Sequence, residues 1–241
     1  MMETQDGLLE RWHEVWERKG KEKIKEKYTL QDLIDIDGFD KGAGNMTEEV
    51  WLKAVGVAIR ELELRPNEYL LEVGCGAGAM LLPLSETGVK VTGVDFSSSL
   101  IDIAKKIIPN FVGHVGEAAN LPYQDNEFDK ILSHGVFHYF PDYDYSERVL
   151  KEMLRVLKKG GKMLIMDIPD ISKKSASEVT RMRSLPEGEH ERLYSQYPHL
   201  YYDKGWFEHF AQNNLFYLKI FDQEIEGYGN SPFRFNVLMW R

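Results

Sequence analysis

Three glycines at alternate positions, Gly74, Gly76 and Gly78, directly follow an apolar run that contains one acidic residue, Glu72. The run, residues 69–73, predicts a buried parallel strand, and the glycines predict a tight turn into a helix. Because glycine has no Cβ, its backbone can adopt positive φ and lie close to a ligand. The pattern therefore predicts a nucleotide-type binding loop at residues 74–79.

The loop alone leaves two classes of ligand open. Gly74, Gly76 and Ala79 also satisfy the dinucleotide fingerprint, and Asp95 lies close to the offset of about 20 residues expected for a ribose-binding acid. Glu72 would repel the pyrophosphate of a dinucleotide, but it would attract a ligand that carries an ammonium group. Glu72 thus favours S-adenosylmethionine, whose sulfonium and amino groups are both positive, over NAD.

Polar residues also follow the later apolar runs, where an open α/β sheet binds its ligands. Asp95 could accept hydrogen bonds from both ribose hydroxyls, and Phe96 could pack on an adenine ring. Glu117 could accept from the adenine amino group. The stretch from Ser133 to Tyr139 would then lie beside the reacting centre.

Two histidines in that stretch could act as a general base, because histidine titrates near neutral pH. His138 is the first candidate and His134 the second. Either could instead be a packed histidine that only shapes the pocket. Further ligands at suitable spacing are missing nearby, so we expect no metal site.

The elements that must position these residues alternate between strand and helix from residue 69 to residue 168, which predicts a parallel sheet with crossover helices. Residues 1–45 predict a helical extension or lid, and residues 46–241 a single domain with a substrate-covering insertion at about 169–204. The helix before the last parallel strand is expected to include Lys158 and Lys159 in its last turn. Strands are expected at residues 69–73, 90–94, 110–114, 128–133, 162–168, 215–221 and 233–240, the last two as an antiparallel hairpin.

Composition excludes several classes of function. The 241 residues carry a net charge of −9, which argues against a general nucleic-acid or anionic-membrane surface. Apolar runs are shorter than the ~20 residues of a membrane span, and the first ten residues lack the form of a signal peptide. A single cysteine, Cys75, excludes an intrachain disulfide framework and suits a reducing compartment. We therefore expect a cytoplasmic protein with neither nucleic-acid nor membrane partners.

As an ordered set, four motifs resemble the class I S-adenosylmethionine-dependent methyltransferases, in particular the small-molecule branch related to the ubiquinone and menaquinone enzymes. They are residues 71–78, residues 93–97, Leu121-Pro122-Tyr123 with Phe128-Asp129, and residues 156–161. The resemblance implies an α/β fold. It would have a Rossmann-like, seven-stranded, mostly parallel sheet with an antiparallel last strand, helices on both faces and the N-terminal helical extension.

The same resemblance implies S-adenosylmethionine as cofactor and S-adenosylhomocysteine as product. The implied cofactor contacts are Glu72, Gly74, Gly76, Gly78, Asp95, Phe96, Glu117, Ala118 and Ser133. At position 117 the family more often has aspartate. The predicted activity is in-line methyl transfer to a small molecule, with O- or N-methylation favoured. The alternatives are an NAD-dependent oxidoreductase and a non-catalytic cofactor-binding regulatory subunit.

Aromatic residues outside the motifs are candidates for the acceptor pocket. They are Tyr28, Tyr139, Tyr202 and Trp206. Such rings could bind an apolar, sugar-like or cationic acceptor, or they could form the core of the insertion. The acceptor and the oligomeric state do not follow from the sequence.

Overall fold

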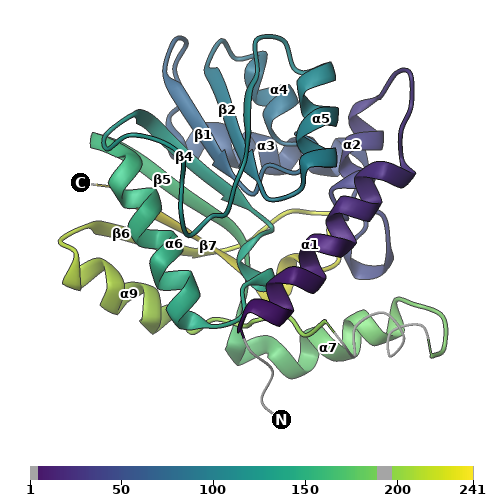
Figure 1. Ribbon diagram of the computed structural model, residues 1–241. Coiled ribbons are helices and arrows are strands. Elements are labelled where there is room, and N and C mark those ends of the chain that lie inside the picture. The colour runs from purple at the N-terminus through teal and green to yellow at the C-terminus, as the bar shows by residue number, and fades with distance from the viewer. Residues whose placement is uncertain (1–4, 189–196, 241) are drawn as a thin grey trace.

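The computed structural model describes residues 5–188 and 197–240, and its centre is one seven-stranded sheet (Figure 1). The strand order is β3-β2-β1-β4-β5-β7-β6, and β7 runs antiparallel to both of its neighbours while the other pairs are parallel. The predicted fold class is confirmed. The strands are β1 (Tyr69–Val73), β2 (Lys90–Asp95), β3 (Val112–Val115), β4 (Phe128–His134), β5 (Leu157–Pro169), β6 (Tyr217–Asp222) and β7 (Arg234–Trp240).

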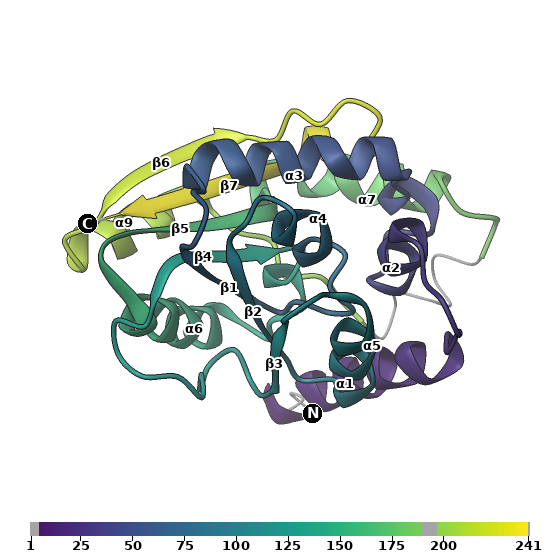
Figure 2. The same ribbon diagram turned by 90° about the horizontal axis from the view of Figure 1, so that it is seen from above.

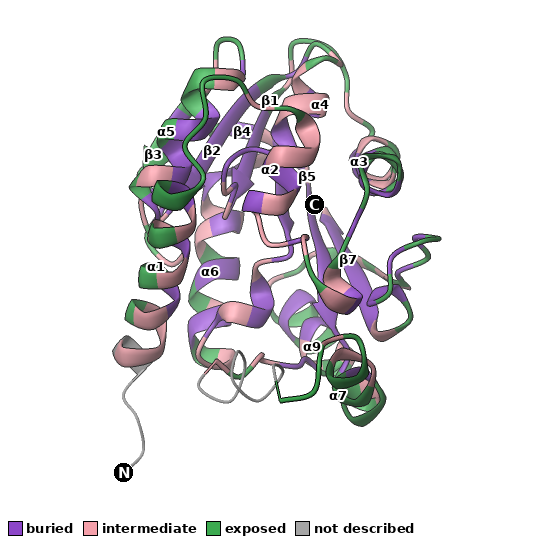
Figure 3. Cartoon of the chain, turned by 90° about the vertical axis from the view of Figure 1, so that its right-hand side faces the viewer, coloured by how far each residue is buried: buried purple, intermediate pink, exposed green. Residues whose placement is uncertain are grey.

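Helices cover both faces of the sheet. One apolar cluster joins α1–α5 to one face, and a second joins α6 and α9 to the other. Figure 2 shows α3 and α6 on opposite sides of the sheet, and Figure 3 shows the strands as its buried interior. The helices are α1 (Gln5–Glu22), α2 (Leu30–Ile36), α3 (Glu48–Leu62), α4 (Leu81–Ser85), α5 (Ser98–Ile107), α6 (Tyr143–Val156), α7 (Lys174–Arg183) and α9 (Lys204–Asn213), with 3-10 turns η1 (Gly42–Gly44), η2 (Phe137–Tyr139), η3 (Ile171–Lys173) and η4 (Ser231–Phe233).

Side-chain caps explain where several helices begin. Thr47 accepts from the backbone N–H of Val50 at the start of α3, and Ser97 accepts from that of Leu100 at the start of α5. Each bond satisfies one of the first-turn N–H groups that have no partner inside the helix. The cap at Ser97 fixes the start of α5 three residues after Asp95, the last residue of β2.

The boundary between α6 and β5 differs from the prediction. The helix ends at Val156, and Lys158, Lys159 and the two following glycines belong to β5. Leu157 already pairs with Phe128 of β4, and the Lys158 ammonium donates to Asp129 across the same pair of strands. This tertiary pairing outweighs the C-terminal helix signal of the lysines and glycines.

The N-terminal segment packs against the side of the sheet that carries α5. Helix α1 lies beside α5 (Figure 1), and Trp12 and Trp16 of α1 belong to the same apolar cluster as α2 and α3. Helix α1 ends at Glu22, so the predicted helical extension is interrupted before α2 begins at Leu30. The predicted domain division at residue 45 stays a prediction.

Candidate active site

One cavity of about 420 Å³ lies at the carboxyl ends of β1, β2, β3 and β4. Its walls come from α1, from the segment after α2, from the glycine loop and from the loops after β2, β3 and β4. Several predicted cofactor residues line it together: Glu72, Gly74, Gly76, Asp95, Phe96, Glu117 and Ala118. Sheet topology thus gathers residues that are up to 46 positions apart in the sequence.

The glycine loop requires its glycines for conformation and for space. Gly74 and Gly76 have φ values of 76° and 52°, where a side chain is strained. A Cβ at Gly74 would lie 2.4 Å from Cγ2 of Val136, and one at Gly76 would lie 2.3 Å from Oδ1 of Asp37. Gly78, at φ 89°, faces Ile108 of the core and does not line the cavity.

Asp95 ties the glycine loop to the start of α5. Its Oδ2 accepts from the backbone N–H of Gly76 at 2.9 Å, and its Oδ1 accepts from that of Ser97 at 2.9 Å. Each carboxylate oxygen can accept a further bond, and Asp95 lines the cavity. Burial raises the pKa of Asp95 to about 6, although these two amide bonds oppose the rise.

Glu72 is a buried acid with an unused oxygen. Its residue is 2% exposed, and within the described chain its Oε2 has no hydrogen-bond partner. Burial, together with the nearby charges of Asp37 and Asp95, raises its pKa well above the usual value. A buried, unpartnered carboxylate is costly unless a ligand supplies a donor. The amino group of S-adenosylmethionine fits that need.

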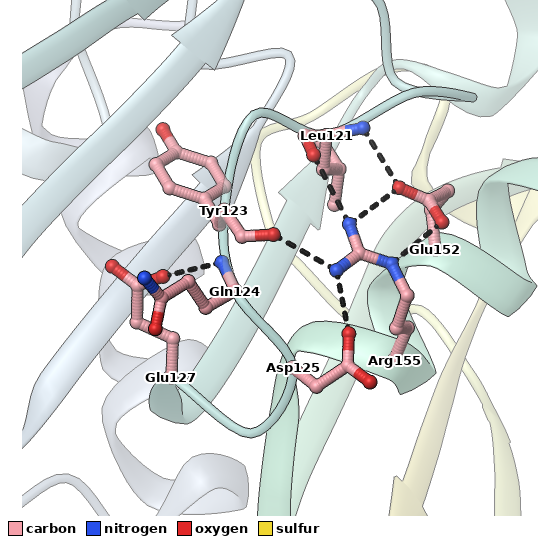
Figure 4. A network of polar contacts seen from close by, with 7 residues as sticks. All are labelled: Leu121, Tyr123, Gln124, Asp125, Glu127, Glu152 and Arg155. Atoms are coloured by element: carbon pink, nitrogen blue, oxygen red, sulfur yellow. Dashed lines mark hydrogen bonds and ion pairs between the residues drawn. The ribbon is translucent and has the colours of Figure 1, made fainter.

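Arg155 of α6 holds the loop between β3 and β4 (Figure 4). Its guanidinium donates to the carbonyl oxygens of Leu121 and Tyr123 and to Glu152, and it also pairs with Asp125. Glu152 in turn accepts from the backbone N–H of Leu121. Glu117 and Ala118, which belong to this loop, are thereby held at the cavity.

The structure separates the two candidate histidines. His134 lines the cavity, is 6% exposed, and has an Nε2 without a hydrogen-bond partner in the described chain. Its ring packs against those of Phe39 and Trp51. Burial lowers the pKa of His134 to about 4, so its imidazole is neutral at physiological pH.

His138 does not line the cavity. It is 4% exposed, and its ring lies 4.5 Å from that of His199. Burial and the nearby charge of Arg234 lower its pKa well below the usual value. Its assignment as the first general base stays a prediction, and the placement favours His134 over it.

The remaining predicted residues also divide into those that line the cavity and those that do not. Ser133 points its hydroxyl into the sheet and donates to the carbonyl of Val73. Tyr139 lines the cavity, whereas Tyr28, Tyr202 and Trp206 do not. Tyr202 is fully buried and donates to the carbonyl of Phe137. The roles of these residues as substrate contacts stay predictions.

The sequence predicts a helical extension or lid before residue 45, but it does not identify the side chains with which this segment lines the cavity. Trp12, His13 and Trp16 of α1 line the cavity, and so do Asp37 and Phe39. The spacing of the two tryptophans indicated only an apolar helix face. No local signal marked Asp37, because its contacts lie 40 and 42 residues away in the glycine loop.

Across the residues that the structure describes, no three histidine, cysteine or acidic side chains are grouped so as to hold a metal ion.

The sequence is similar to those of known methyltransferases. A methyltransferase domain family matches residues 71–165. The chain is 36% identical over 148 residues to a demethylmenaquinone methyltransferase of Thermotoga maritima, which covers 61% of this chain and 59% of that protein. It is 36% identical over 103 residues to a probable tRNA methyltransferase 9B of Homo sapiens, which covers 43% and 22%. The chain therefore spans less than two thirds of either relative.

A solved structure extends the match over most of the fold. It is described as an S-adenosylmethionine-dependent methyltransferase of Methanococcus maripaludis, and it aligns with 90% of this chain and 95% of its own. The TM-score is 0.58 at 18% identity, which supports the shared fold. The glycine loop, the acids beside it and the matched domain agree. The domain match, the similarity to quinone methyltransferases and the shared fold together support a class I S-adenosylmethionine-dependent methyltransferase related to the quinone methyltransferases.

Proposed function

We propose that this protein transfers a methyl group from S-adenosylmethionine to a small-molecule acceptor. The observation that carries the proposal is the unpartnered Oε2 of Glu72, which is buried at a cavity that the glycine loop also lines. Glu72 would accept from the cofactor's ammonium group. Asp95 would accept from the ribose hydroxyls, and Phe96 and Glu117 would contact the adenine.

The cofactor supplies an electrophilic methyl on a sulfonium: the S–CH₃ bond breaks with its electron pair left on sulfur, while a lone pair of the acceptor forms the new bond to carbon. An oxygen or nitrogen acceptor also releases a proton. The main work of the protein is to align the acceptor and exclude water. The aromatic rings of Trp12, Trp16, Phe39 and Trp51 supply such a wall.

His134 is the residue best placed to receive the acceptor's proton. Its neutral ring lines the cavity with one nitrogen unpartnered in the described part of the chain. A neutral imidazole nitrogen without a hydrogen can accept a proton, and positioned general bases contribute about 10²–10⁴-fold to rate. We therefore assign His134 as the proposed general base for an O- or N-methylation.

The lining of the cavity favours a small molecule over a nucleic acid. None of the described residues that line it is lysine or arginine, and five are acids: Glu10, Asp37, Glu72, Asp95 and Glu117. Phosphate backbones are bound mainly through lysine and arginine. The similarity to a probable tRNA methyltransferase supports RNA as the second candidate. Within residues 5–188 and 197–240 no helix is long and apolar enough to cross a membrane, and the cytoplasmic location stays a prediction.

Transfer of a labelled methyl group tests both candidates. Purified protein is incubated with methyl-labelled S-adenosylmethionine and either a protein-free metabolite extract or total tRNA, with Asp95→Ala as the matched control. We expect label in small molecules, made only by the unsubstituted protein. Label in tRNA alone would replace the small-molecule proposal by the second candidate.

A further inference from the structure

We propose that Asp37, contributed by the N-terminal extension, is a cofactor-binding residue that makes the site prefer the positively charged sulfonium cofactor over its neutral thioether product. The inference rests on the proposed function, because it concerns the same cavity. Asp37 lies outside the four sequence motifs. Its proposed role is to favour replacement of the bound product by fresh cofactor.

The position of Asp37 is fixed by the glycine loop itself. Its Oδ1 accepts from the backbone N–H of Ala77 at 2.6 Å, and its Oδ2 accepts from that of Ala79 at 3.1 Å. The half-buried side chain also lines the cavity. Two backbone donors therefore hold a carboxylate in place where the methionine part of the cofactor is expected to bind, before any ligand arrives. Such a preorganised charge costs no reorganisation when a cation binds.

Asp37 belongs to a group of three acids that converges on the cavity from three different elements. Glu72 comes from β1, Asp95 from β2 and Asp37 from the segment after α2. The charges of Asp37 and Asp95 both act on Glu72, and the charge of Asp95 acts on Asp37. A cation bound among them would therefore interact with all three.

The protein places little positive charge beside these three acids to balance them. Lys19 of α1 acts on Asp37, but its ammonium pairs with Asp40 at 3.7 Å and lies over the ring of Trp16. Asp37 also interacts with Asp95, Glu72 and the thiol of Cys75, and the imidazole of His13, which lines the same cavity, acts on Asp95. The unpartnered Oε2 of Glu72, which is 2% exposed, independently indicates that the missing cation comes from a ligand.

A carboxylate pair suffices for the ammonium, which both cofactor forms carry. The sulfonium is the charge that distinguishes them, since methyl transfer converts it to a neutral thioether. Loss of that charge removes a Coulomb attraction that falls off only slowly with distance inside a protein. A third acid at the site therefore strengthens binding of the fresh cofactor more than binding of the product.

Titration with both cofactor forms tests this. Dissociation constants for S-adenosylmethionine and S-adenosylhomocysteine are measured at about pH 8, where Asp37 is ionised, for the unsubstituted protein, Asp37→Asn and Asp35→Asn. Asparagine keeps an oxygen that can accept from the loop but removes the charge. Asp35 lies in α2, bonds to Gln31 and does not line the cavity, so its variant is the matched control.

We expect Asp37→Asn to weaken S-adenosylmethionine binding about tenfold while S-adenosylhomocysteine binding changes by less than about threefold, and Asp35→Asn to change neither. Equal weakening of both ligands, or no change in either, would overturn the proposal, because Asp37 would then only fix the loop or be dispensable. Binding of neither ligand by the unsubstituted protein would contradict the proposed function itself, and the inference with it.

A second measurement does not depend on the variant's folding. Burial, opposed by the bonds from Ala77 and Ala79, raises the pKa of Asp37 to about 7. In the unsubstituted protein the preference for S-adenosylmethionine should therefore decline several-fold between about pH 8 and about pH 6, as first Asp37 and then Asp95, whose pKa is about 6, gain protons. A preference that stays constant over this range would count against the inference.

Discussion

At the scale of single residues, the site is a set of buried acids that have few positively charged partners among the described residues. Asp95 uses both oxygens to hold the glycine loop and the start of α5, and it still lines the cavity. Glu72 keeps one oxygen unpartnered in the described chain. Burying acids in this way is unfavourable for the empty protein and favourable once a cation binds.

Asp95→Ala should weaken S-adenosylhomocysteine binding by roughly 1.5–3 kcal/mol, the worth of hydrogen bonds to a charged group. Titration calorimetry measures the change. Asp102→Ala, on the exposed side of α5, is the control and should bind normally. Unchanged affinity in the Asp95 variant would refute its assignment to the ribose.

His134→Asn should slow turnover about 100-fold or more while cofactor affinity stays within about twofold, because it removes a base and not a cofactor contact. His138→Asn, tested in parallel, should lose much less, since His138 does not line the cavity. Because the pKa of His134 is about 4, the reaction should show no inflection near pH 6.5 from this residue. A larger loss in the His138 variant would reverse the two assignments.

At the scale of elements, α1 is hydrogen-bonded to the segment that follows Asp95, from Phe96 to the first turn of α5. The carboxylate of Glu17 accepts from the hydroxyls of Ser97 and Ser98 and from the backbone N–H of Ser99. His13 lies 3.1 Å from the carbonyl oxygen of Phe96. The helix that forms one wall of the cavity is therefore tied to the cofactor loop by polar contacts.

Glu17→Ala should lower the free energy of unfolding by roughly 1–3 kcal/mol and increase hydrogen exchange in α1. Burial alone would raise the pKa of Glu17, but the bonds from Ser99 and Ser97 lower it to about 2. Its contribution is thus complete above about pH 4.5 and is lost as the pH falls toward about 2. Urea unfolding and exchange mass spectrometry measure both effects. An equal loss in Glu14→Ala, an exposed position on the same helix, would contradict the role of Glu17.

How far the sequence predicts the structure also differs between elements. The glycine loop, Asp95 and the strands were predictable because their signals are local: residue types at short, fixed spacings. The end of α6 was not, since pairing of Leu157 with Phe128 decides it. Asp37 and the wall formed by α1 were not either, because long-range contacts place them. The cofactor residues that lie in local motifs are thus predictable from the sequence, whereas Asp37 and the residues of α1 that line the cavity are placed by long-range contacts.

At the scale of the whole molecule, the raised pKa values predict opposite pH effects on stability and on ligand binding. Burial raises the pKa of Asp37 to about 7 and of Asp95 to about 6, so the folded protein holds protons that the unfolded chain releases near pH 4. The contribution of these two protonated groups to the free energy of unfolding is therefore complete below about pH 4 and is lost as the pH rises to about 7.

A bound cation favours the ionised acids, so the rise in Tm caused by S-adenosylmethionine, which carries a sulfonium and an ammonium group, should be larger at about pH 8 than at about pH 5.5. Thermal melts with and without the ligand at both pH values measure this. A ligand-induced shift that is equal or smaller at the higher pH would show that these acids are not neutralised by the ligand.

The central claim, that this cavity is a site for S-adenosylmethionine, is tested most directly by calorimetric titration of the purified protein with S-adenosylhomocysteine, with NADH as the control ligand. The account predicts saturable binding of S-adenosylhomocysteine at one site per chain and no binding of NADH. Binding of NADH alone, or of neither ligand, would contradict it.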